Sequence, residues 1–271
     1  MAGVMGWPVA HSRSPAIHNH WIHQYGLNGT YGLFPVKPGD IQTAIQGLKA
    51  LGLAGCNITI PHKVEAIKCM DWVEPLALRM GAINTIVVQP DGALHGFNND
   101  GFGYIQSLRE AQPNWSANGP IVILGAGGAA RAIVVSLIDA GATEIRILNR
   151  TRSKSNALAQ EFGAPVNAFD WTERHEALDG ATLLVNTTNQ GMHGQAALDI
   201  ELTQLPITAL VSDAIYVPLE TPLLAAARLR GNTTVNGLGM LLHQARPAFH
   251  AWFGVMPEVT AELRKTITSS L

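Results

Sequence analysis

The stretch that decides the fold is residues 121–131, which read Ile121-Val122-Ile123-Leu124-Gly125-Ala126-Gly127-Gly128-Ala129-Ala130-Arg131. A short apolar run is followed at once by a glycine-rich turn and by residues that begin a helix. Glycines there let backbone N–H groups and the helix N-terminus approach a pyrophosphate without a Cβ in the way. Because a strand and a helix flank the glycines, the pattern favours a dinucleotide-binding turn over an ordinary tight turn.

The end of the next predicted strand, Glu144–Leu148, bears on the choice of cofactor. NAD sites usually carry Asp or Glu there, about 20 residues past the glycines, to bond the ribose 2′-hydroxyl. This chain has Asn149-Arg150-Thr151-Arg152, with Lys154 close behind, and no carboxylate. Guanidinium, ammonium and hydroxyl groups suit a 2′-phosphate, so the sequence predicts NADP. The alternative is a solvated basic turn at the start of a helix.

Alternating strands and helices indicate βαβ units and an α/β protein. The expected strands are Val4–Met5, Thr30–Val36, Gly55–Ile60, Ala82–Val88, Pro120–Leu124, Glu144–Leu148, Thr182–Val185 and Leu210–Asp213. The expected helices are one that starts at Ser14 as its N-cap, Asp40–Leu51 ended by Gly52, one after Pro61, Ala129–Ala140 and Met240–Phe253. We expect two α/β domains: the first with a mixed, mainly parallel sheet, the second Rossmann-type.

Composition narrows the class of protein. The 271 residues are 47% hydrophobic and 14% charged, which suits a globular protein of two domains. A net charge of −2 gives no support for a nucleic-acid or membrane partner. The two cysteines, Cys56 and Cys69, offer neither a disulfide framework nor zinc spacing, and we expect no metal. The first residues do not resemble a signal peptide, so a cytoplasmic location is expected.

Four polar clusters lie in residues 6–103, with small hydroxyl or amide groups at the ends of apolar strands. They are Gly6-x-Pro8-x-x-His11-Ser12-x-Ser14-Pro15-x-x-His18-Asn19, Asn57-x-Thr59-x-Pro61-His62-Lys63, Gly81-Ala82-Ile83-Asn84-Thr85 and Asn98-Asn99-Asp100-Gly101-x-Gly103. Open α/β folds bind ligands at such strand ends.

With these clusters, the Gly125 turn, Asn186-Thr187-Thr188 with Gly191-Met192, and residues 236–241 with Gln244, the chain resembles the shikimate dehydrogenase family. The match runs in order over nearly the whole chain. It implies an NADP-dependent oxidoreductase acting on a CH–OH group, which reversibly reduces 3-dehydroshikimate to shikimate in aromatic amino-acid and chorismate biosynthesis. It also implies a substrate-binding and catalytic domain at 1–101, a Rossmann NADP-binding domain at 102–237, and C-terminal helices at 238–271 that pack back on the first domain. The expected partners are the small substrate and, as a homodimer, a second copy of the chain.

The resemblance assigns roles residue by residue. Lys63 and Asp100 match the catalytic pair: Lys63 would give a proton to the developing alkoxide, and Asp100 would orient the ammonium. The substrate residues would be Ser12, Ser14, Asn57, Thr59, Asn84, Tyr216 and Gln244, with the two serines on the carboxylate. The cofactor residues would be Gly125, Ala126, Gly127, Gly128, Ala129, Asn149, Arg150, Thr151, Lys154, Thr187, Thr188, Gly237 and Met240. Competing interpretations are helix capping for Ser14, core packing for Met240 and a surface helix for Lys63.

Two departures from the family pattern leave the substrate open. Asn99 stands where the family usually has threonine, and Trp7, the residue after the family glycine Gly6, is a large side chain. A relative acting on quinate or on an amino analogue of shikimate, with NAD in place of NADP, is therefore the first alternative. A non-catalytic NADP-binding regulator is the second, although it would need no Lys63–Asp100 pair. An enzyme resembling methylene-tetrahydrofolate dehydrogenase is the third.

Overall fold

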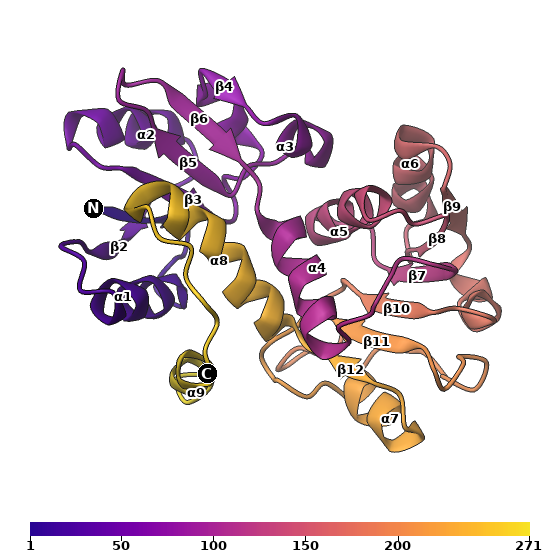
Figure 1. The fold of residues 1–271 in the computed structure, drawn as a ribbon. Coiled ribbons are helices and arrows are strands. Elements are labelled where there is room, and N and C mark those ends of the chain that lie inside the picture. The colour runs from indigo at the N-terminus through magenta and orange to yellow at the C-terminus, as the bar shows by residue number, and fades with distance from the viewer. The chain divides into compact units, whose positions relative to one another are not determined.

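The computed structural model describes residues 1–271, which form two compact units (Figure 1). The first unit is Met1–Asp100 with Leu242–Leu271, and the second is Gly101–Leu241. The chain leaves the first unit at the start of helix α4 (Asp100–Ala111) and re-enters it within helix α8 (Gly237–Phe253). Each unit contains one six-stranded sheet, so the predicted fold class of two α/β domains is confirmed.

The second unit has a fully parallel sheet with strand order β12-β11-β10-β7-β8-β9. The strands are β7 (Pro120–Leu124), β8 (Glu144–Leu148), β9 (Val166–Phe169), β10 (Leu183–Asn186), β11 (Leu210–Asp213) and β12 (Thr234–Val235). The order reverses between β7 and β10, the place where open α/β sheets bind dinucleotides. This is the Rossmann arrangement that the glycine turn predicts.

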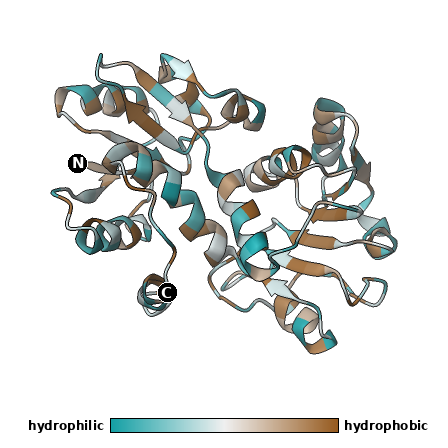
Figure 2. Cartoon of the chain, in the orientation of Figure 1, coloured by the Kyte–Doolittle hydropathy of each residue, from teal (hydrophilic) through white to brown (hydrophobic).

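Strand β7 reads as a continuous apolar run because both of its faces are buried. Ile121 and Ile123 belong to a core shared with α4, α5 (Gly128–Asp139) and α6 (Arg152–Phe162). Val122 and Leu124 belong to a second core, on the opposite face, shared with α7 (Pro222–Arg230). In Figure 2 the central strands of this sheet are accordingly brown along their length.

The first unit has a mixed sheet with strand order β2-β1-β3-β5-β6-β4. The strands are β1 (Ala2–Gly6), β2 (Tyr31–Pro35), β3 (Gly55–Ile58), β4 (Trp72–Val73), β5 (Thr85–Val88) and β6 (Leu94–Phe97). Strand β1 pairs in parallel with β2 and β3, and β4 with β6, whereas β5 runs antiparallel to β3 and β6. A turn at Gly92 (φ 85°) joins β5 to β6.

Helices cover both faces of this sheet. The core that contains Ile58 and Ile86 is completed by α2 (Ile41–Ala50) and α3 (Pro75–Met80). Helices α1 (Ser14–Gln24) and α9 (Ala261–Thr268) contact each other, and α1 packs on β1 and β2.

Two local predictions are wrong. Helix α1 begins one residue early, so that Arg13 is the N-cap and Ser14 the first helical residue; Pro15 is therefore the second helical residue, where its fixed φ still suits the first turn. After Pro61 the chain forms only the 3-10 helix η1 (Glu65–Cys69), and Lys63 lies in the loop before it. The sequence also did not predict β4, β6, β9 and β12: β4 and β12 have only two residues each, and β6 (LHGF) and β9 (VNAF) contain polar residues or glycine in place of a continuous apolar run. No helix of the chain has both the length and the apolar character needed to span a membrane.

Candidate active site

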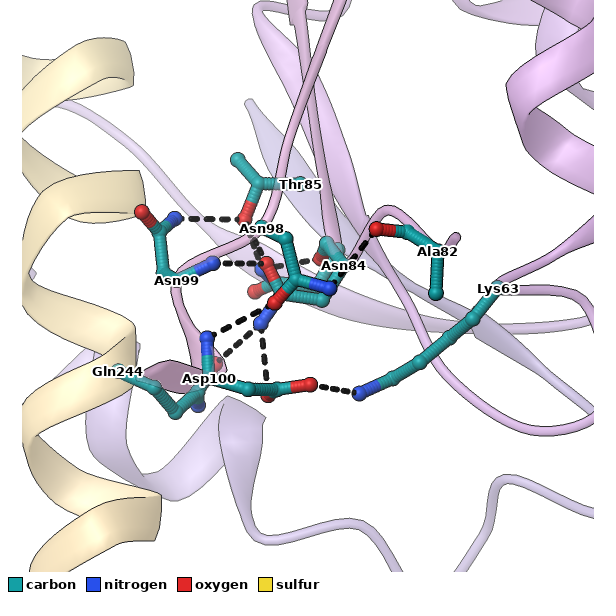
Figure 3. Close-up of polar contacts among 9 residues, drawn as sticks. Lys63, Ala82, Asn84, Thr85, Asn98, Asn99, Asp100 and Gln244 are labelled. Atoms are coloured by element: carbon teal, nitrogen blue, oxygen red, sulfur yellow. Dashed lines mark hydrogen bonds and ion pairs between the residues drawn. The ribbon is translucent and has the colours of Figure 1, made fainter. Parts of the chain in front are cut away.

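A lysine and a carboxylate that are far apart in the chain meet in the first unit. Lys63 Nζ lies 2.6 Å from Asp100 Oδ2, and their side chains are 27% and 17% exposed (Figure 3). Lys63 comes from the loop after β3, and Asp100 is the first residue of α4. A half-buried ammonium held by one carboxylate can donate a proton to a molecule bound beside it.

The mixed sheet explains why these residues converge. Strand β5 runs antiparallel between β3 and β6, so its first residue, Thr85, pairs with Asn57 near the end of β3 and with Phe97 at the end of β6. The end of β3, the start of β5 and the end of β6 therefore share one edge of the sheet. Asn84 reaches this edge because it directly precedes the antiparallel strand β5, whereas the predicted strand Ala82–Val88 placed Asn84 inside the strand.

Asn84 connects the ion pair to the sheet. Its Nδ2 donates to Asp100 Oδ1 (2.9 Å) and to Gln244 Oε1 (3.3 Å) on α8. Its Oδ1 accepts from the Thr85 hydroxyl (2.9 Å) and from the backbone N–H of Asn99 (3.0 Å). Both ends of the carboxamide are thus satisfied, and Asn84 holds one oxygen of Asp100 while Lys63 pairs with the other (Figure 3).

A buried polar row lies behind Asn84. Asn57 donates to the Asn84 carbonyl (2.9 Å) and to Thr85 Oγ1 (3.1 Å) and accepts from the Tyr31 hydroxyl (2.6 Å). Burial raises the pKa of Tyr31 well above its ordinary value, so its phenol remains a donor. Asn57 is 6% exposed, and both of its N–H donors are bonded within the protein.

The loop that carries Lys63 is fixed by its backbone and by His62. The Lys63 carbonyl accepts from the Ile83 N–H (2.9 Å), which ties the loop to the segment before Asn84. The His62 ring is fully buried and bonds the Val36 carbonyl (2.7 Å). His62 therefore packs and anchors, and it presents no group to the ion pair.

The remaining predicted substrate residues are spread over both units. Ser12 Oγ accepts from the Ser14 N–H (3.3 Å) at the start of α1, and Ser14 is buried. Thr59 follows β3 and packs tightly on Gly6, where an added Cβ would lie 2.4 Å from its methyl group. Tyr216 belongs to the second unit, in the loop after β11.

The second unit has a pocket of about 230 Å³ at the glycine turn. Eight of the predicted cofactor residues line it: Gly125, Ala126, Gly127, Asn149, Arg150, Lys154, Thr187 and Thr188. Three further lining residues, Trp171, Asn189 and Gln190, were not predicted. Trp171 gave no signal because it begins a short 3-10 helix (Trp171–Glu173) after β9, remote in sequence from the glycines.

The geometry of the turn suits a phosphate-bearing ligand. Gly125 has φ 108°, and a Cβ there would lie 2.4 Å from Thr187 Oγ1, so only glycine fits. Nothing lies within 4 Å of a Cβ added to Gly127 or Gly128, and no side chain caps α5. The N–H groups that begin α5 are therefore open to an anion.

The basic segment divides into two parts. Arg150 and Lys154 line the pocket, whereas Arg152 pairs with Asp170 (2.9 Å). Asn149 Nδ2 donates to the Thr151 carbonyl (2.9 Å), which closes the turn before α6.

The other predicted cofactor residues lie outside this pocket. Gly128 and Ala129 begin α5, and Thr151 is the N-cap of α6. Gly237 packs so closely that an added Cβ would lie 2.2 Å from the Ala214 carbonyl oxygen. Met240 packs against the core on α5. The chain contains no cluster of three His, Cys, Asp or Glu side chains able to hold a metal ion.

Three family models match the chain in succession. Residues 4–86 match the shikimate dehydrogenase substrate binding domain, residues 109–194 the shikimate / quinate 5-dehydrogenase model, and residues 237–264 the shikimate 5′-dehydrogenase C-terminal domain. Among whole proteins, the chain is 51% identical over 270 residues to a shikimate dehydrogenase (NADP(+)) of Paramagnetospirillum magneticum. That alignment covers 99% of this chain and 98% of the relative.

Solved structures agree. Shikimate 5-dehydrogenase from Thermus thermophilus, in complex with NADP(H) and shikimate, matches with a TM-score of 0.88 and 34% identity, covering 100% of this chain and 99% of that one. Quinate dehydrogenase from Corynebacterium glutamicum, in complex with NAD, matches with a TM-score of 0.91 and 29% identity, covering 99% and 98%. With family models and relatives aligned over nearly its whole length, the chain belongs to the shikimate dehydrogenase family.

Proposed function

We propose that the protein catalyses the reversible NADP-dependent reduction of 3-dehydroshikimate to shikimate. The observation that carries the proposal is the Lys63–Asp100 ion pair at 2.6 Å, embedded in a row of amides in a unit matched by the family's substrate-binding model. A protein that only bound the cofactor would have no use for a proton-donating pair held in this way.

Bound NADPH would supply the hydride. In the reducing direction Lys63 donates a proton to the alkoxide oxygen that develops on the ring. Asp100 Oδ2 holds the ammonium in place, and its Oδ1 is fixed by Asn84. Proton donation by a positioned side chain contributes typically about 10²–10⁴ in rate.

The neutral residues of the first unit would hold the ring. Ser12 and Ser14 place hydroxyl groups at the start of α1, where the N-cap residue Arg13 provides no side-chain cap and the helix dipole favours a carboxylate. Thr59 and Gln244 would bond the ring hydroxyls. Asn84 and, behind it, Asn57 would line the site, because their own N–H donors are already bonded within the protein.

The second unit would hold the cofactor. Its open glycines and uncapped α5 suit the pyrophosphate, and Arg150 and Lys154 suit a 2′-phosphate, so the residues present fit NADP. Thr187 and Thr188 would close the same pocket. Gly237 and Met240, at the start of α8 after β12, would contact the cofactor, and Tyr216, in the loop after β11, would contact the substrate. A cytoplasmic homodimer is the form in which we propose the enzyme works.

A relative that prefers quinate and NAD is the second candidate. The feature that favours it is Asn99, whose Nδ2 bonds Thr85 Oγ1 (3.0 Å) next to the ion pair. An amide there offers a substrate different hydrogen-bonding groups from a threonine hydroxyl, and buried polar groups discriminate strongly between ring substituents.

The test is a comparison of turnover for shikimate and quinate, each with NADP and NAD, followed by the absorbance of the reduced nicotinamide. We expect the highest kcat/KM for shikimate with NADP. Preference for quinate with NAD would replace the first candidate with the second, and absence of turnover on either acid would overturn both.

A further inference from the structure

We propose that Thr85 is a positioning residue: its hydroxyl holds the Asn84 carboxamide in the one orientation in which an N–H group faces Asp100. The inference rests on the proposed function for its catalytic consequence. Thr85 is 1% exposed and lies one residue beyond Asn84 at the start of β5. It touches neither Lys63 nor Asp100, and it acts through its neighbours (Figure 3).

Two backbone groups fix the polarity of this network, because their donor or acceptor character cannot change. The Asn99 N–H lies 3.0 Å from one side-chain atom of Asn84, which must therefore be Oδ1. The Asn84 carbonyl lies 2.9 Å from a side-chain atom of Asn57, which must therefore be Nδ2.

The role of the Thr85 hydroxyl follows from these two assignments. Asn57 Nδ2 also lies 3.1 Å from Thr85 Oγ1, so the hydroxyl accepts there. Its single proton is then donated to Asn84 Oδ1 at 2.9 Å, and its remaining lone pair accepts from Asn99 Nδ2 at 3.0 Å. All three hydrogen bonds that a hydroxyl can make are used.

The consequence reaches the ion pair. With Oδ1 of Asn84 held by Thr85 and by the Asn99 N–H, the other end of the carboxamide presents Nδ2 to Asp100 Oδ1 at 2.9 Å. Without the Thr85 proton, one backbone bond alone keeps the oxygen on that side. The carboxamide would then move, and Asp100 would hold Lys63 less well.

The experiment compares Thr85→Val, which removes the hydroxyl at nearly constant shape, with Thr85→Ser, which keeps it. The loss of one neutral hydrogen bond lowers kcat roughly 3- to 10-fold for Thr85→Val. We expect the KM for NADP to be unchanged, the solvent deuterium isotope effect on kcat to rise, and Thr85→Ser to restore kcat to within about twofold of wild type. The matched control is Thr260→Val, which removes a hydroxyl that caps α9 in the same unit and should leave kcat unchanged.

Several results would overturn the proposal. A kcat within twofold of wild type for Thr85→Val would show that the hydroxyl does not matter. An equal loss in Thr85→Ser would assign the effect to the methyl group. If Thr85→Val does not fold, Thr85→Cys replaces it, since a thiol is a weaker donor of similar size, and an unchanged kcat there would count equally against the role. A wild-type enzyme without turnover contradicts the proposed function alone; a crystal structure of the valine variant would then decide, and an Asn84 amide still turned to Asp100 would reject the positioning role.

Discussion

Replacement of Arg150 by alanine should weaken the binding of NADP and leave the binding of NAD unaffected. The segment at the end of β8 carries two arginines in different situations. Arg150 lines the pocket and makes no ion pair, whereas Arg152 is engaged with Asp170 at 2.9 Å. A charge-assisted hydrogen bond contributes about 1.5–3 kcal/mol, and the lower value applies because Arg150 is exposed. Since about 1.4 kcal/mol is tenfold, the ratio of kcat/KM for NADP to that for NAD should fall roughly tenfold.

The assay measures initial rates with saturating shikimate over a range of each cofactor. Arg152→Ala is the matched control: it removes the same group two residues away and should keep the ratio within about twofold, because exposed ion pairs contribute only about 0–1 kcal/mol. An equal change of the ratio in both variants, or an equal loss of NADP and NAD activity in Arg150→Ala, would refute the assignment of the 2′-phosphate to Arg150.

Two further predictions concern stability. Gly125→Ala should lower the free energy of unfolding by about 1–3 kcal/mol, because φ is 108° and the new Cβ would lie 2.4 Å from Thr187 Oγ1. Gly127→Ala is the control: its Cβ would lie in open space, so its free energy of unfolding should stay within about 0.5 kcal/mol of wild type. Equal denaturation midpoints for the two variants would contradict this prediction. Burial lowers the pKa of His18 from 6.5 to about 3. Below about pH 6.5 the unfolded chain therefore binds a proton at His18 that the folded chain does not bind. The free energy of unfolding falls there by up to ~1.4 kcal/mol per pH unit. His18→Phe, which keeps a ring stacked on Tyr31, should lose this slope in urea denaturation between neutral and mildly acidic pH, and parallel slopes would show that His18 is not its source.

The second unit could be predicted closely because its signals are local. Strands Pro120–Leu124, Glu144–Leu148 and Leu210–Asp213 have the bounds expected from their apolar runs, and the glycine turn follows β7 directly, as the sequence predicts. The short edge strands β9 and β12 have no such runs, since an edge strand can be short and partly polar.

The first unit shows what the sequence could not reveal. Motifs quoted from it contain Lys63, Asn84 and Asp100, but only the antiparallel course of β5 brings Asn84 to the same edge as the other two. The sequence did not predict a role for Thr85, although Thr85 is part of the third polar cluster. Its role depends on three hydrogen bonds, to Asn57, Asn84 and Asn99, and these exist only in the folded structure. Strand pairing and tertiary contacts decide such roles, and they cannot be inferred from the pattern of a single sequence.

The most direct test of the central claim is the turnover of Lys63→Ala beside Lys68→Ala, an exposed lysine from the neighbouring 3-10 helix. We expect kcat to fall about 10²–10⁴-fold in the first variant, with NADP binding retained, and to stay at the wild-type level in the second. A Lys63→Ala enzyme that turns over within about threefold of wild type would show that the proton comes from elsewhere.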